Sequence, residues 1–121
     1  EGMEVERWNL LNPEEKKKKS YVEKCLDKRE GPIIAAIDYV RSFSDQIRPY
    51  TYKPFYSLGT DGFGRSDTRE KLRHFFEIDR YYVTVAAIEA LALRGEVERS
   101  LVVEAMRKYD IDRNSPNPST I

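Results

Sequence analysis

The chain has 121 residues, which is the size of one small domain or less. Its 21 Lys and Arg residues balance its 21 Asp and Glu residues, and this neutral charge argues against a nucleic-acid-binding module. A hydrophobic content of 40% is typical of a globular chain, and no apolar run approaches the length that spans a membrane. The single cysteine, Cys25, excludes an internal disulfide, so the sequence favours a reducing cytoplasm.

Residues 1–31 are predicted to form an N-terminal arm and helix, the remnant of a larger domain. The chain starts at Glu1, ahead of its first methionine, and is at once amphipathic, which indicates a piece of a longer protein. The segment Glu4–Asn12 is expected to be the end of a helix or an extended arm. The lysine run Lys16–Lys19 is interpreted as a solvated face or linker. A short amphipathic helix is predicted from the spacing of Tyr21, Val22, Cys25 and Leu26.

Residues 32–113 are predicted to form an α/β core. The continuous apolar run Ile33–Ile37 is typical of a strand that is buried on both faces, as in a parallel sheet. A helix capped by Asp38 and stopped by Pro49 is expected next, followed by a second strand over Phe55–Leu58. Strand, helix and strand make a βαβ unit, so the two strands should be parallel with a right-handed crossover.

Two longer helices are expected to complete this core. Asp79 should cap a helix over residues 80–94, and that helix should be buried because it is apolar almost all round. Gly95 is expected to end it, and a further amphipathic helix over residues 99–109 then forms a helical hairpin. Residues 114–121 are predicted to be an irregular C-terminal tail.

The most distinctive segment is Gly59–Glu70, which follows a strand and precedes a helix, where α/β folds place ligands. Near its end, Asp67 and Glu70 resemble a capping box, so the next helix should start near Thr68. The candidate functional or interdomain residues of this segment are Gly59, Asp61, Gly62, Phe63, Gly64, Arg65 and Ser66.

Three interpretations of the glycine-rich segment stay open. The favoured one is a tight structural loop that packs against another domain, with Phe63 as a plug. The second is the lining of an active site or interdomain cleft. The third is an independent anion site that uses backbone N–H groups with help from Arg65 or Arg69. The glycine spacing matches neither a dinucleotide-binding loop nor a Walker A loop.

Other candidates for chemistry have plainer interpretations. His74 is the only histidine, and without a nucleophile or a metal-ligand partner at fixed spacing it is interpreted as structural. A lone Cys25 is expected to be inert, and one Cys with one His cannot form a zinc site. The last two helices could be taken for a DNA-binding helix-turn-helix, but Glu104 lies in the middle of the face that would read DNA. A helical hairpin that covers a sheet is therefore favoured.

Several segments together resemble the C-terminal end of the first component of pyruvate dehydrogenase complexes, of the homodimeric bacterial type. The most specific is Ser57–Glu70, which contains Leu-Gly-Thr-Asp-Gly-Phe-Gly-Arg-Ser-Asp. The supporting stretches are Val5–Pro13, Asp38-Tyr39, Leu72–Glu77, Asp79, Tyr82-Val83, Ile111-Asp112 and Asn117-Pro118.

The resemblance implies a parent enzyme that decarboxylates pyruvate on thiamine diphosphate with magnesium, and that passes the acetyl unit to a lipoyl group on the dihydrolipoyl acetyltransferase component. It implies a partial, three-layer fold like the transketolase C-terminal domain, with a short, mainly parallel sheet flanked by helices and a helical C-terminal hairpin. The expected partners are the remaining domains, the second subunit of a homodimer and the acetyltransferase. No nucleic acid and no membrane is expected.

This chain is expected to be a structural, non-catalytic segment, so the isolated polypeptide should be inactive. The family's thiamine diphosphate motif begins with Gly-Asp-Gly, whereas Thr60 precedes Asp61 here, so the segment is not that motif. No catalytic, cofactor-binding or metal-binding residue is assigned. In the family this domain begins with two further strands, so an exposed sheet edge and an uncovered apolar face are expected here. The alternative is an autonomous anion- or metabolite-binding α/β module that uses residues 59–70.

Overall fold

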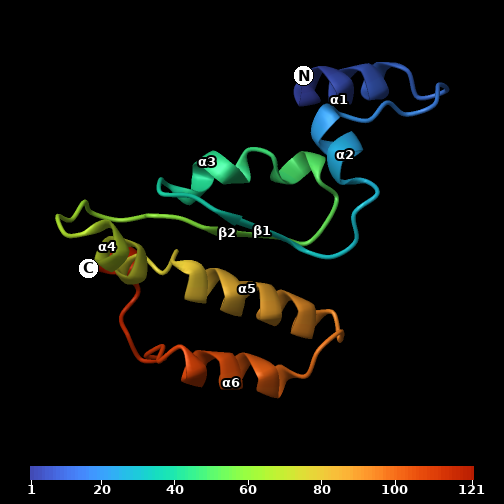
Figure 1. Cartoon of the computed structure of the whole chain (residues 1–121). Helices are drawn as coiled ribbons and strands as arrows, with labels where there is room; N and C mark the ends of the chain where they lie inside the picture. Colours follow the sequence, from blue (N-terminus) through green and yellow to red (C-terminus); the bar gives the residue numbers. More distant parts are fainter.

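The computed structural model describes all residues from 1 to 121 (Figure 1). The helices are α1 (Gly2–Leu11), α2 (Tyr21–Leu26), α3 (Arg41–Asp45), α4 (Arg69–Phe75), α5 (Arg80–Leu93) and α6 (Arg99–Lys108). The strands are β1 (Ile33–Ala36) and β2 (Phe55–Leu58), and single 3₁₀ turns occupy Arg48–Tyr50 and Pro118–Thr120. No helix has both the length and the hydrophobicity that crossing a membrane requires.

The two strands form a parallel pair, as predicted. Ile33 lies opposite Phe55 and Ala36 lies opposite Leu58, so the register has no offset or bulge. The connection between them contains α3 and a 3₁₀ turn, which makes the βαβ unit that the alternation of apolar runs predicts. The α/β class is therefore confirmed.

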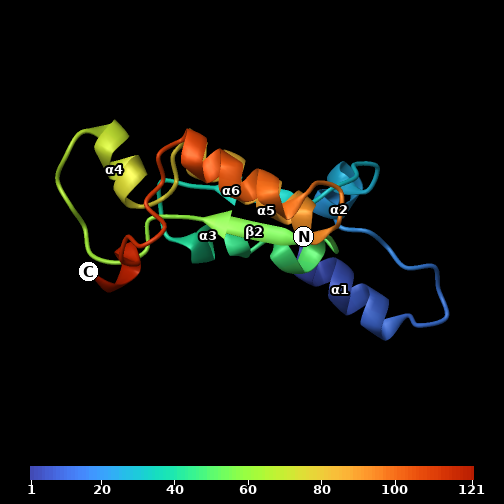
Figure 2. The ribbon, with the colours of Figure 1, turned by 90° about the horizontal axis from the view of Figure 1, so that it is seen from below.

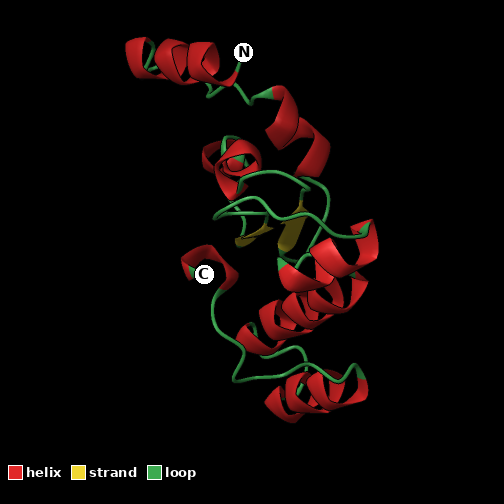
Figure 3. Cartoon of the chain, turned by 90° about the vertical axis from the view of Figure 1, so that its left-hand side faces the viewer, coloured by secondary structure: helices red, strands yellow, loops and turns green.

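Helices lie on both faces of the strand pair. Helix α3 packs on one face, α5 packs on the opposite face, and α6 packs on the outer side of α5 (Figures 1 and 2). The predicted helical hairpin over a sheet is thus confirmed. Helices α1 and α2 stand apart from these layers (Figure 3).

The ends of α5 follow the chemistry that the sequence predicts. The Asp79 carboxylate accepts hydrogen bonds from the backbone N–H groups of Tyr81 and Tyr82, each at 3.0 Å. At the other end Gly95 has a φ of 76°, a left-handed conformation that suits glycine. The Gly95 and Glu96 N–H groups return to carbonyls of the last turn of α5, which closes a Schellman motif.

Two other helix caps differ from prediction. Asp38 does not cap α3, because its carboxylate is bound by Arg73; Val40 occupies the cap position without a side-chain hydrogen bond. Helix α3 ends at Asp45, ahead of Pro49, which lies in the following 3₁₀ turn.

The cap of α4 is Thr68 rather than Asp67. The Thr68 hydroxyl accepts from the Lys71 N–H at 3.3 Å, while the Asp67 carboxylate accepts from the N–H of Thr68 itself. A predicted capping box places the cap at Asp67, but the helix begins one residue later, and the shorter threonine side chain reaches the first turn.

Burial is lower than the apolar runs suggest. Only nine of the 121 residues are buried, and the apolar ones are Phe55, Phe76, Ile78, Ala90, Ala92, Val102 and Ala105. Helix α5, expected to be buried, has only Ala90 and Ala92 as buried residues, and no residue of β1 is buried. A sheet of two strands leaves each strand with one unpaired edge, and it is too narrow to cover a helix of 14 residues.

Candidate functional site

The carboxyl ends of both strands lie at the same edge of the sheet, because the strands are parallel. The glycine-rich loop, residues 59–68, leaves β2 at this edge and at once contacts the segment that follows β1. The Thr60 N–H donates to the Tyr39 carbonyl at 2.8 Å. A Cβ on Gly59 would lie 2.7 Å from that same carbonyl oxygen, so only glycine allows this approach.

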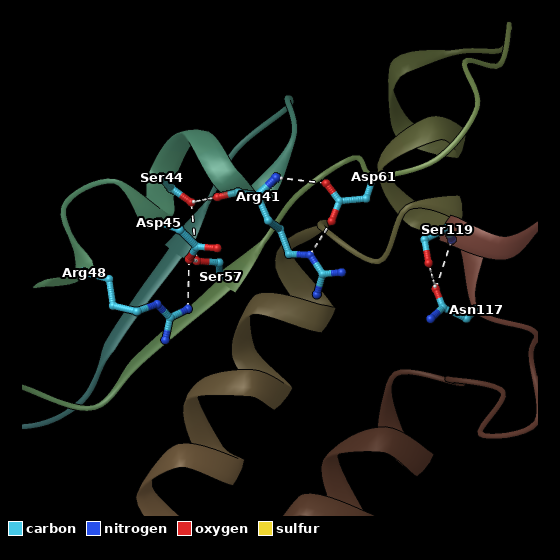
Figure 4. Close-up of polar contacts among 8 residues, drawn as sticks. All are labelled: Arg41, Ser44, Asp45, Arg48, Ser57, Asp61, Asn117 and Ser119. Atoms are coloured by element: carbon cyan, nitrogen blue, oxygen red, sulfur yellow. Dashed lines mark hydrogen bonds and ion pairs between the residues drawn. The ribbon is translucent and has the colours of Figure 1, made fainter.

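Asp61 joins the loop to the start of α3. One carboxylate oxygen accepts from the Arg41 backbone N–H at 3.0 Å and the other accepts from Arg41 Nε at 2.6 Å (Figure 4). These two bonds hold the pKa of Asp61 below its ordinary value, the side-chain bond having the larger effect. Both oxygens of Asp61 are therefore engaged within the chain.

A second polar cluster lies behind this pair. The Asp45 carboxylate accepts from the Ser57 hydroxyl and, at 2.8 Å, from the Arg48 guanidinium (Figure 4). The serine bond first, and then the arginine, lower the pKa of Asp45. Arg48 also donates to the Phe55 carbonyl at 2.7 Å. The cluster fastens α3 and the turn after it to β2.

Gly62 contacts the C-terminal tail. It has a φ of 106°, and a Cβ at this position would lie 3.0 Å from both the Pro118 carbonyl oxygen and the Ser119 Cα. The tail is expected from sequence to be irregular, but Asn117 caps a 3₁₀ turn over Pro118–Thr120. Sequence reasoning missed this contact; the available signal is Asn117-Pro118-Ser119, since Asn before such a turn bonds the backbone two residues on.

The outer part of the loop turns away from the body. The Phe63 side chain is 80% exposed, so nothing within the chain receives the predicted plug. Gly64 has open space around it. The Arg65 guanidinium lies 4.0 Å from the centre of the Phe75 ring, a cation–π arrangement that ties the loop to α4. Ser66 takes part in none of these contacts.

Helix α4 is joined to the same edge by an ion pair. Arg73 donates two hydrogen bonds to Asp38, at 2.6 and 3.2 Å, and lowers the pKa of that carboxyl. His74 Nδ1 lies 3.0 Å from the Asp79 oxygen that does not cap α5. The histidine is thus bound to a structural residue.

A groove of about 830 Å³ lies between these loops, α5, α6 and the tail. Glu77 and Tyr82 line it, and burial raises the pKa of both side chains. Arg41 also lines the groove, although the sequence does not single it out. The sequence feature that could have identified Arg41 is its position shortly after the end of a strand. No group of three or more His, Cys, Asp and Glu side chains is placed to hold a metal ion.

The parallel βαβ unit, the helices on both faces and the glycine-rich edge define an α/β domain class, and the comparison with known families agrees. The chain belongs to the transketolase-like TK C-terminal domain family, whose pattern matches residues 4–79.

Proteins with similar sequences carry the name pyruvate dehydrogenase E1 component. The protein of Cupriavidus necator is 57% identical over 121 residues, all of this chain, and that of Pseudomonas aeruginosa is 55% identical over 119 residues, or 98% of it. The protein of Escherichia coli K12 is 44% identical over 119 residues. The chain spans only 14% of the length of the first two relatives and 13% of the third. This similarity does not favour an autonomous anion-binding module.

Proposed function

We propose that the chain forms part of a thiamine-diphosphate-dependent pyruvate dehydrogenase component, to which it contributes scaffolding and an assembly surface. The similarity to such proteins along the full chain is the observation that supports this most directly. The structure adds that Asp38, Asp45 and Asp61 are all engaged by side chains of the same chain. The polar residues at the sheet edge therefore order loops.

The residues present do not fit the magnesium ion that such an enzyme binds with thiamine diphosphate. A magnesium site needs carboxylate or carbonyl oxygens that are free to coordinate the ion. Asp61, the carboxylate of the glycine-rich loop, has both oxygens bound to Arg41, whose positive charge would also repel a cation. In this proposal the cofactor is held by other parts of the enzyme, and pyruvate is decarboxylated there.

The proposed partners are the remaining domains, a second subunit of a homodimer and the dihydrolipoyl acetyltransferase, within the cytoplasm. Exposed large apolar side chains support an assembly role, because apolar surface is stabilised when a partner removes it from water. The large apolar residues that are at least 56% exposed are Met3, Leu10, Leu11, Tyr21, Tyr39, Phe43, Tyr52, Phe63 and Leu93.

Titration calorimetry tests the non-catalytic part of this proposal. The 121-residue chain, mixed with thiamine diphosphate and Mg²⁺, should give no binding heat, and it should not consume pyruvate. Tight cofactor binding or turnover by this polypeptide alone would overturn the proposed role.

Coexpression as two pieces tests the assembly part. The chain and the rest of the enzyme polypeptide should restore pyruvate decarboxylation only when both are present. Phe43→Asp, which places a charge on a 57% exposed aromatic, should lower the recovered activity. Asn114→Asp adds the same charge in the exposed tail and should leave it unchanged. Equal activity of the two variants would contradict docking through the apolar surface.

A further inference from the structure

The glycine-rich loop is held from two opposite directions. On the β1 side, Asp61 binds Arg41 and Thr60 binds the Tyr39 carbonyl. On the other side the backbone of Pro118 and Ser119 lies against Gly62, so close that a Cβ on Gly62 would push against it at 3.0 Å. Figure 2 shows the C-terminal turn beside the loop that joins β2 to α4.

The C-terminal turn is complete in itself. Asn117 Oδ1 accepts from the Ser119 N–H at 3.0 Å and from the Ser119 hydroxyl at 2.8 Å (Figure 4). The Thr120 hydroxyl and N–H both donate to the Asn117 carbonyl, at 2.8 and 3.0 Å. The turn is therefore a preformed shape, and its contact with the loop is one of van der Waals fit between two backbones.

From these contacts we infer that the C-terminal turn, residues 117–120, is a latch that positions the glycine-rich loop. It rests on Gly62, next to the Arg41–Asp61 pair, and so fixes the backbone that presents Phe63 to solvent. Removing the latch leaves the loop anchored on the β1 side alone. This inference concerns contacts within the chain and stands or falls separately from the proposed function.

Amide hydrogen exchange tests the latch in both directions, because exchange reports local opening. Of residues 60–64, only Thr60 donates its backbone N–H to a hydrogen bond, so the Thr60 amide reports on the loop. Deleting residues 117–121 should raise exchange of this amide roughly tenfold and leave the amides of α5 unchanged. In the intact chain, Gly62→Ala should raise exchange of the Ser119 and Thr120 amides by a similar factor, although the substitution lies more than 50 residues away in sequence. If the truncation also unfolds α5, the exchange of the Ser119 and Thr120 amides in Gly62→Ala decides whether the latch exists.

Two other glycines supply matched controls. Gly31 has a φ of 100°, close to that of Gly62, but has nothing within 4 Å, so Gly31→Ala introduces backbone strain alone. Gly64 lies in the same loop with open space around it. Neither Gly31→Ala nor Gly64→Ala should change exchange of the Ser119 and Thr120 amides.

A separate readout follows Phe63. In a Trp8→Phe background, Phe63→Trp supplies the single tryptophan of the chain, and its fluorescence anisotropy should fall when residues 117–121 are deleted. Unchanged loop exchange in the truncated chain, or unchanged tail exchange in Gly62→Ala, would overturn the latch.

Discussion

The body of the protein, residues 32–113, and the N-terminal arm, residues 1–31, are ordered by different forces. All seven buried apolar residues belong to the body, whereas the only buried residue of the arm is Ser20. Polar contacts hold the arm instead: the Asn9 amide exchanges two hydrogen bonds with the Lys18 backbone, at 2.8 and 2.9 Å. Helix α1 has no buried residue, and a helix of ten residues without burial is marginal in water. Global stability should therefore depend on the body.

The largest effect should come from the buried aromatic residue that begins β2. Phe55 is 5% exposed, so Phe55→Ala should lower the free energy of unfolding by about 3–5 kcal/mol. Leu10 is 76% exposed on α1, so Leu10→Ala should change it by less than about 0.5 kcal/mol. Urea denaturation measures the free energy of unfolding of both variants. Similar losses for the two variants would remove the distinction between body and arm.

Capping sharpens the comparison within the body. Asp79→Ala removes the side chain that caps α5 and should cost about 1 kcal/mol in urea denaturation. Glu98 occupies the corresponding position of α6 without a side-chain hydrogen bond, so Glu98→Ala is the matched control and should be nearly neutral. A larger loss for Glu98→Ala than for Asp79→Ala would contradict the assignment of the cap.

Acid should weaken the body through its paired carboxylates. Asp38, Asp45 and Asp61 have a folded-state pKa below the unfolded value of about 3.9. Their stabilisation is thus present above pH of about 4 and is lost as the pH falls through the folded pKa values.

NMR titration of the Asp61 carboxyl checks the cause of this shift. Arg41→Met keeps the backbone N–H donor and removes the guanidinium, so the pKa of Asp61 should rise part of the way to its ordinary value. Arg48→Met removes a guanidinium that binds Asp45 and not Asp61, so it should change the Asp61 titration much less. A titration that is unchanged in Arg41→Met would show that the pair does not form.

The smallest effect should be confined to the arm. Asn9→Ala removes both bonds to Lys18 and should raise amide exchange in residues 2–19 without changing the urea midpoint. Asn114→Ala, in the exposed tail, serves as the control for loss of an asparagine side chain. A shift of the global midpoint in Asn9→Ala would mean that arm and body unfold together.

Local chemistry was predictable from sequence, and contacts between distant segments were not. The strands, their parallel pairing, the Asp79 cap and the Gly95 stop all follow from patterns a few residues long. Asp38 is a good helix cap by residue type, yet Arg73, 35 residues later, takes its carboxylate.

The site shows the same limit. The glycine-rich loop is recognisable from its composition, but the partners of its residues, Arg41 and Ser119, lie 20 and 57 residues from Asp61 and Gly62. The burial of α5 was overestimated from sequence, because an apolar helix indicates only that its surface is more stable when another element packs on it. The pattern does not say whether the same 121 residues provide it.

The close approach at Gly59 has a consequence for tolerance to mutation. In a saturation library of this chain, selected for folded protein, alanine should be depleted at Gly59, where a methyl group would meet the backbone of Tyr39 and Arg41. At Gly64, which has free space, small residues should persist. A loop with several glycines would thus contain both a position closed to substitution and one open to it.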